Sequence, residues 1–340
     1  MAGARITPAF DYVSKHPNSP ISLFADAGHG HFDYSQALIN YLCLFITKAA
    51  KARLPATMAI DHPAILKPIQ PRDGWLMDRW HKDTLPFAKA APAALYRGIR
   101  RWSSWVFDEE MADATEQYYA EARGKINQHI GILQNGVAVA PQKTHANYAL
   151  KFMPLSDGIS FTVNAFFADT SRLQPVQQHA ATPIVINRIC GPVKKLDDTT
   201  FQVSFYRMGF NNPKRSNDIW LLAHNEGDAQ YKSIMQQIDL RFPIENKAGK
   251  EQVIDFPPIP DQGHDAHSYP LNAVSSLGLR VQYYVQEGPA VVKDSKLLFT
   301  KIPPRSKYPV KVVVVAWQYG NANEPKVKTA KWVERVFYVK

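Results

Sequence analysis

The sequence predicts a mixed but mainly β fold: a short strand–helix segment, a partly helical connector, and then two antiparallel β-sandwich domains. Three observations support this prediction. The first 55 residues hold one short apolar run followed by one long one. The next 95 are broken by prolines and glycines and punctuated by tryptophans. Beyond residue 150, short β-rich runs alternate with turn signals.

Size and composition limit the class of protein. With 340 residues the chain can form two or three domains, and we place the segment boundaries at 1–55, 56–150, 151–247 and 248–340. Hydrophobic residues make up 45% and charged residues 21%, as in ordinary globular proteins. No apolar run is long enough to cross a bilayer, so we expect no transmembrane segment.

The charge balance is basic but diffuse. The net charge is +10 and the isoelectric point is near 9.4. Basic residues are scattered, without a dense block. This permits weak attraction to anionic surfaces or polymers, and we expect no nucleic-acid partner.

The first segment is predicted to be a buried strand followed by a helix. "ISLFAD" (21–26) is the strand, and Asp33 is a suitable N-cap for a helix that runs from Tyr34 to about Ala52. The helix sequence is apolar on most faces, which predicts burial on most faces. Cys43 lies in this run and is expected to be a buried free thiol. Because Cys190 is the only other cysteine, a disulfide framework and a cysteine zinc cluster are excluded.

The second segment is predicted to be an extended connector that ends in a helix. Its broken part carries Trp75, Trp80, Trp102 and Trp105. The run 108–125 has an acidic first turn and an Arg-Gly-Lys ending, both typical of helix ends.

The remaining chain has the alternation of two sandwiches. Runs such as "GISFTVNAFF", "TFQVSFYRM" and "DIWLLAH" fall in 151–247, and six or seven strands fit into 248–340. "PVKVVVVAW" is apolar enough to be a central strand.

The last 90 residues resemble the immunoglobulin-like repeats of bacterial secreted and surface proteins. The similarity is carried by "QVIDFPPIPDQ", "NAVSSLGLRVQYYVQEGPAVVKDSKLLFT", "VVVAWQYGNANEP" and "VERVFYV". It departs from the repeats at "KIPPRSKYP". The resemblance implies an extracellular or cell-envelope location, although the N-terminus lacks a signal-peptide pattern.

The first 55 residues resemble the C-terminal end of an α/β-hydrolase, where a last strand leads to the catalytic histidine and a closing helix. "ISLFAD", "AGHGHFDYS" and "QALINYLCLFITKAAKARLP" follow this order. The resemblance makes His31 a candidate general base, with Asp26 as a second catalytic candidate. The chain has no Gly-x-Ser-x-Gly elbow, so an esterase nucleophile would have to lie in a missing N-terminal part or a partner chain.

The same loop allows two other interpretations. His29, His31 and Asp33 resemble the opening of the metal motif of metallo-β-lactamase-like hydrolases, but Tyr34 stands where the next histidine belongs. Asp26 could instead accept backbone hydrogen bonds, with the histidines serving structural roles. We therefore expect no metal and no other cofactor.

A binding function is the alternative to hydrolysis. Exposed aromatic rings stack on sugars, and Trp220, Trp317 and Trp332 are candidates, although Trp317 could instead fill a sandwich core. The sequence thus leaves two hypotheses. One is the C-terminal part of a secreted hydrolase-like protein that is inactive alone. The other is a non-catalytic extracellular protein that binds a polymer or carbohydrate.

Overall fold

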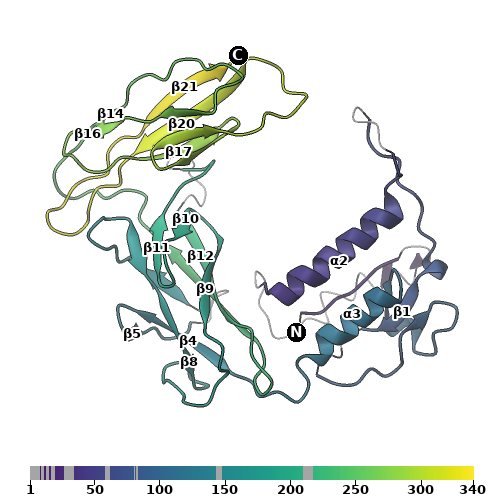
Figure 1. The fold of residues 1–340 in the computed structure, drawn as a ribbon. Helices are drawn as coiled ribbons and strands as arrows, with labels where there is room; N and C mark the ends of the chain where they lie inside the picture. Colours follow the sequence, from purple (N-terminus) through teal and green to yellow (C-terminus); the bar gives the residue numbers. More distant parts are fainter. Residues whose placement is uncertain are drawn as a thin grey trace. The chain divides into compact units, whose positions relative to one another are not determined.

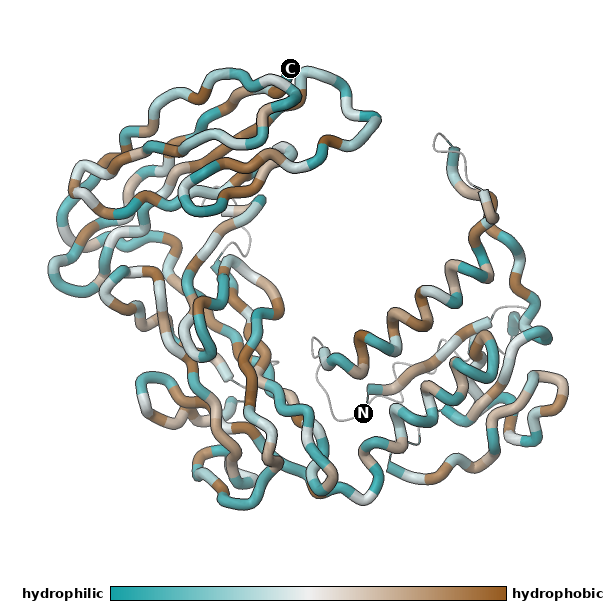
Figure 2. Tube along the Cα trace, viewed as in Figure 1, coloured by the Kyte–Doolittle hydropathy of each residue, from teal (hydrophilic) through white to brown (hydrophobic). Residues whose placement is uncertain are grey.

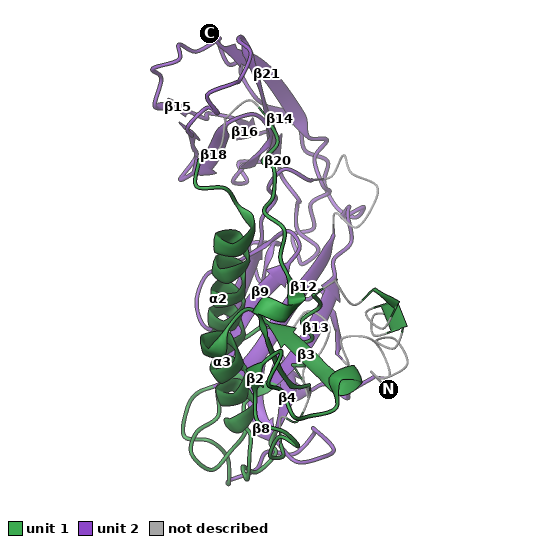
Figure 3. Cartoon of the chain, turned by 90° about the vertical axis from the view of Figure 1, so that its right-hand side faces the viewer, with its two compact units in different colours: residues 1–128, 178–183, 225–234 green, residues 129–177, 184–224, 235–340 purple. Residues whose placement is uncertain are grey.

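The fold is mainly β, as predicted. The computed structural model describes residues 8, 11–12, 15–16, 20–26, 34–57, 62–79, 81, 83–142, 148–209 and 217–340. The chain forms two compact units (Figure 3). Unit 1 comprises residues 1–128, 178–183 and 225–234, and unit 2 comprises 129–177, 184–224 and 235–340.

In the described part of unit 1, helices α2 and α3 accompany a small sheet (Figure 1). Helix α2 spans Gln36–Arg53 and helix α3 spans Glu109–Ala120. The sheet has the order β2-β1-β3, and all its pairs are antiparallel. Its strands are β1 (Trp75–Asp78), β2 (Ala91–Pro92) and β3 (Ser103–Val106), with short 3-10 turns at Pro71–Asp73 and Arg100–Trp102. The part predicted to be an extended connector therefore contains a sheet.

Helix α2 differs from its prediction in cap and burial. Its N-cap is Ser35, whose hydroxyl accepts a hydrogen bond from the Leu38 amide at 3.0 Å, so the assignment of the cap to Asp33 was wrong. Of its 18 residues only Tyr41 is buried, and Cys43 is exposed. The expected burial on most faces was wrong because unit 1 packs against only one side of the helix.

The segment 20–26 is extended beside β3 rather than a regular strand. The Ser104 hydroxyl accepts from the Leu23 amide at 2.7 Å and donates to the Leu23 carbonyl at 3.1 Å. The Trp105 amide donates to the Ile21 carbonyl at 3.3 Å. The Ser104 hydroxyl thus satisfies backbone groups of Leu23 that would pair with backbone groups in a regular β-ladder. The segment packs against the connector.

Unit 2 begins with three sheets that build the first sandwich. Sheet β5-β4-β8 pairs β4 (His129–Gln134) with β5 (Val137–Ala138) and β8 (Asn164–Ala168). Sheet β10-β11-β7 contains Val193–Lys195, Thr200–Val203 and Ser160–Thr162. Sheet β6-β13-β12-β9 contains Ala149–Lys151, Ile234–Arg241, Asp218–Asn225 and Val185–Cys190.

The C-terminal part of unit 2 is a second antiparallel sandwich. Its central sheet β17-β20-β21 joins Gln282–Glu287, Val310–Trp317 and Val333–Val339. Sheet β15-β19-β18 joins Ser268–Pro270, Lys296–Phe299 and Ala290–Lys293, and β14 (Ile254–Asp255) pairs with β16 (Val274–Ser275). Strand β20 lies centrally, as predicted, and Val312, Val314 and Ala316 enter a core with Phe256 and Phe337.

Candidate functional site

The one described residue of the predicted catalytic pair, Asp26, is held by a tyrosine. The Tyr118 hydroxyl on α3 donates to Asp26 Oδ1 at 2.5 Å. Burial, reinforced by the Asp26 carboxylate, raises the pKa of Tyr118 far above its ordinary value. Tyr118 therefore stays protonated and acts as a permanent donor to Asp26.

An aromatic cluster fixes the segment that ends at Asp26. The Phe24 ring stacks on Tyr41 of α2 with centroids 3.9 Å apart and meets Tyr118 edge-on at 4.7 Å. The Tyr119 hydroxyl accepts from the Ala25 amide at 3.0 Å, and the Tyr41 hydroxyl lies 3.1 Å from the Thr115 hydroxyl. Such contacts are typical of a packed core, in which rings add stability beyond the area they bury.

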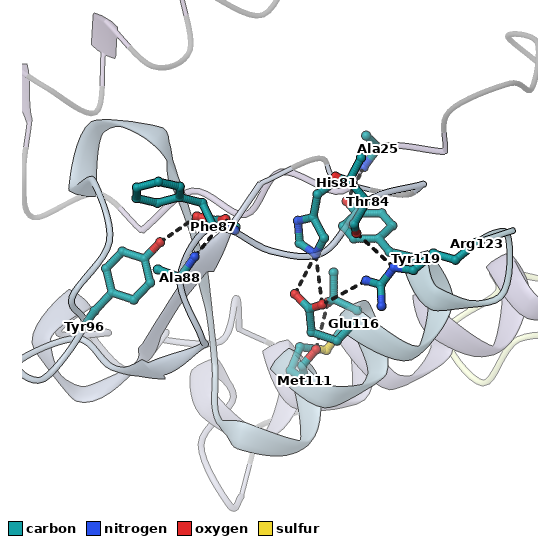
Figure 4. A network of polar contacts seen from close by, with 12 residues as sticks. Ala25, His81, Thr84, Phe87, Ala88, Tyr96, Met111, Glu116, Tyr119 and Arg123 are labelled. Carbon is teal, nitrogen blue, oxygen red and sulfur yellow. Dashed lines mark hydrogen bonds and ion pairs between the residues drawn. The ribbon is translucent and has the colours of Figure 1, made fainter.

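A second polar group surrounds Glu116 of α3 (Figure 4). His81 Nε2 lies 2.8 Å from Glu116 Oε1, and the His81 ring meets Tyr119 edge-on at 5.0 Å. The Arg123 guanidinium lies 3.6 Å from Glu116 Oε2 and donates through Nε to the Thr84 carbonyl at 2.9 Å. An imidazole and a carboxylate at this distance can exchange a proton. Here the group also ties the chain around residues 81–84 to helix α3.

The histidine loop lies outside the described residues. The loop contains His29, His31 and Asp33. Trp80 of the connector also lies outside the described residues. The general base and the alternative metal site therefore stay predictions. Among the residues that the structure does describe, no group of three or more His, Cys, Asp or Glu side chains is arranged to hold a metal ion.

The three sandwich tryptophans differ in exposure. Trp317 is only 1% exposed and meets Phe205 edge-on at 4.9 Å, so its ring fills the core of unit 2 and offers no stacking surface. Its role as an exposed binding residue was therefore wrong. Trp220 and Trp332 are partly exposed, and their binding role stays a prediction.

The tyrosines of α3 were missed by the sequence analysis. The buried residues of α3 are Met111, Ala112, Thr115, Tyr118 and Tyr119, spaced by three or four positions. This spacing marks the inner face of an amphipathic helix. It predicts that both tyrosines face the interior of unit 1, but it does not identify Asp26 as the partner of Tyr118.

The outer face of α2 carries an apolar stripe, formed by Ile39, Leu42, Cys43 and Ile46. The exposed fractions of the three aliphatic side chains are 40%, 44% and 64% in chain order. Figure 2 shows hydrophobic residues along this helix. Lys48, in contrast, lies on the inner side and forms ion pairs with Asp108 and Glu110.

A shallow acidic groove borders the inner edge of α2. It has a volume of about 510 Å³ and is lined by Leu44 and by residues of α3 that include Glu109, Glu110 and Asp113. Three carboxylates favour cations, but Lys48 already neutralises part of this charge.

Comparisons with known proteins leave the family of this chain open. No protein-family model and no curated protein matches it. Several solved structures with some likeness to this chain are cadherin fragments. Drosophila N-cadherin EC1-4 shares 10% identity over 57% of this chain and 47% of its own, with a TM-score of 0.20. Mouse protocadherin-24 EC1-3 shares 12% identity over 84% of this chain and 86% of its own, with a TM-score of 0.22.

The chain spans about half the length of the N-cadherin fragment that it matches. TM-scores near 0.2 assign it neither a fold family nor a function. In the part of the chain that the structure describes, no helix is both long and apolar enough to cross a membrane.

Proposed function

We propose that this chain is a non-catalytic, extracellular binding protein, whose unit 1 docks onto a protein partner through α2 and whose sandwiches bind or space a polymer. The observation that carries the proposal is the apolar stripe of α2. Ile39, Leu42 and Ile46 recur at helical spacing on one exposed face, and no charged residue lies among them.

An uncharged exposed face is unusual for a helix of a soluble domain. Surface helices normally place charged and polar residues opposite their apolar face. Covering a large aliphatic side chain fully is worth about 1.5–3 kcal/mol. Docking of the stripe therefore favours a partner with a matching apolar surface, such as a sheet face or a second helix.

The stripe also bears on the identity of the partner. The resemblance of residues 1–55 to the end of an α/β-hydrolase makes a missing hydrolase part, or a separate chain of that kind, the partner we favour. In that arrangement unit 1 would complete another apolar core and need no nucleophile of its own. We also propose that the segments 1–55, 56–150, 151–247 and 248–340 are the sequence modules from which the two units are assembled.

The sandwiches are the second part of the proposal. Trp220 and Trp332 are partly exposed and remain candidates for stacking on a sugar or another polymer. The resemblance of the last 90 residues to bacterial immunoglobulin-like repeats supports a spacer or binding role in the cell envelope or outside the cell.

Docking through α2 is tested by self-association, because an apolar stripe that its partner does not cover is expected to bind a second copy of the chain. We expect the sedimentation coefficient of the wild-type chain to rise with concentration. The double variant Ile39→Lys, Ile46→Lys should stay monomeric. The control Val253→Lys, at a side chain that is 70% exposed in unit 2, should behave as wild type. Identical behaviour of the wild type and the double variant would count against docking through α2.

Ester hydrolysis is a second candidate function. It is favoured by the extended segment that ends at Asp26 and precedes helix α2. If the chain itself were an esterase, wild type would hydrolyse p-nitrophenyl esters and His31→Ala and Asp26→Asn would lose that rate. We expect all three proteins to show the same background rate. A rate that depends on His31 would overturn the non-catalytic proposal.

A further inference from the structure

Two loops of unit 1 expose an unusual number of large apolar side chains. They connect β1 with β2 and β2 with β3, and we call residues 84–102 the loop surface. The side chains and their exposed fractions are Leu85 (77%), Phe87 (82%), Leu95 (65%), Ile99 (51%) and Trp102 (53%). Single exposed apolar residues are normal on a protein, but five within 18 positions indicate an interaction surface.

The loop surface is also one-sidedly basic. Lys89, Arg97, Arg100 and Arg101 are exposed within it, and residues 84–107 contain no aspartate or glutamate. Asp83, which immediately precedes the surface, is paired with Lys232 at 2.9 Å. Because residues 84–107 contain no acidic side chain of their own, the basic residues of the loop surface attract anions.

A partly buried carboxylate holds the two loops against each other (Figure 4). Asp78, at the end of β1, accepts from the Phe87 amide, from the Ala88 amide at 3.2 Å and from the Tyr96 hydroxyl at 3.0 Å. Gly98 packs so closely that an added Cβ would lie 2.3 Å from the Tyr96 hydroxyl oxygen. The exposed side chains thus project from a defined scaffold.

Trp102 brings the apolar and basic features together. The guanidinium carbons of Arg79 and Arg101 lie 5.2 Å and 5.7 Å from its ring centroid. Tryptophan and arginine side chains both suit a membrane interface. The tryptophan ring and the apolar stem of arginine lie among the lipid chains, while the guanidinium group reaches the headgroups.

We propose that the loop surface binds an anionic lipid membrane peripherally. Leu85, Leu95 and Ile99 are aliphatic and cannot stack on sugars or bases, which argues against a glycan or a nucleic acid. Insertion of apolar side chains beside basic ones is the physical basis of interfacial binding. This surface is separate from the stripe of α2, so the proposal goes beyond docking to a protein.

Vesicle co-sedimentation of the full chain tests this. We expect binding to vesicles of mixed phosphatidylcholine and phosphatidylglycerol, and much weaker binding to phosphatidylcholine alone. Leu85→Ser with Phe87→Ser should weaken binding about tenfold or more. Lys89→Gln with Arg97→Gln should weaken it about fivefold per charge removed, and added salt should mimic that loss.

Matched controls make the result decisive. Val253→Ser and the pair Lys301→Gln, Lys307→Gln alter exposed residues of unit 2 and should bind as wild type, as should Ile39→Ser with Ile46→Ser. Circular dichroism confirms that each variant is folded. The proposal is overturned if anionic vesicles are not bound, if only the α2 variant loses binding, or if the loop variants bind as wild type.

Discussion

A single buried phenol, that of Tyr319, predicts a pH dependence in the alkaline range. Its side chain is 3% exposed and its hydroxyl donates to the Pro243 carbonyl at 2.7 Å. Burial raises the pKa of Tyr319 to about 12. The folded state thus holds this proton more tightly than the unfolded state does. The stability it contributes is complete below pH 10 and is lost as the pH rises toward 12.

The variant Tyr319→Phe should reveal this contribution. Near pH 8 it should be destabilised by about 1 kcal/mol through the lost hydrogen bond. Between pH 10 and 12 its free energy of unfolding should fall by about 2–3 kcal/mol less than that of wild type. Urea unfolding at several pH values measures both effects. The prediction would be contradicted if the free energy of unfolding fell equally steeply with pH in wild type and variant. The control is Tyr308→Phe, at an exposed tyrosine.

The contacts of individual residues, and hence their roles, were hard to predict from the sequence. Trp317 could be read either as a stacking platform or as core, and its 1% exposure decides for the core. Asp26 was identified as a polar residue at the end of a strand-like run. Its partner Tyr118 lies 92 positions away, and no local pattern reports a contact at that separation.

At the scale of elements, the bounds of the helices were predicted well, but which of their faces are buried was predicted poorly. The helix expected from Tyr34 to about Ala52 is observed at Gln36–Arg53, and the one expected at 108–125 is observed at Glu109–Ala120. Propensity and end signals are local, so they can be read from a single sequence. Which side of α2 is covered depends on its neighbours, and a sequence that is apolar all round does not contain that information.

Strands show the same contrast between local sequence signals and contacts with distant parts of the chain. The run of valines in β20 predicts a central strand because such strands are buried on both faces. The sheet β2-β1-β3 was missed, since β2 has two residues and lies among prolines and glycines. Its pairing Leu76–Trp105 depends on a register that only the folded chain defines.

At the scale of the whole molecule, the chain leaves unit 1 and returns to it twice. Residues 178–183 and 225–234 belong to unit 1 although the stretches between them build unit 2. A linear division of the sequence cannot express such returns, because they depend on long-range contacts. Within unit 1, a buried polar network around Gln128 and Asn225 gathers three separate parts of the chain.

Asn225 is the centre of that network and the best place to test it. It is 1% exposed. Its amide nitrogen donates to the Thr182 carbonyl at 2.8 Å and to the Pro183 carbonyl at 3.1 Å. Its oxygen accepts from Gln128 Nε2 and from the Gly227 amide, both at 2.9 Å. Removing it leaves several buried partners unsatisfied.

We therefore expect Asn225→Ala to lower the free energy of unfolding by about 2–4 kcal/mol, because each buried group left without a partner costs about 1–3 kcal/mol. Asn225→Asp should also destabilise, since a carboxylate would face two carbonyl oxygens. The control Asn323→Ala removes one exposed hydrogen bond, to the Pro154 carbonyl at 3.1 Å, and should stay within about 0.5 kcal/mol of wild type. Urea unfolding gives the free energies, and hydrogen exchange of the Gly227 amide locates the effect. If Asn225→Ala and Asn323→Ala have the same free energy of unfolding, and the Gly227 amide keeps its protection from exchange, then contacts other than this network hold residues 178–183 and 225–234 in unit 1.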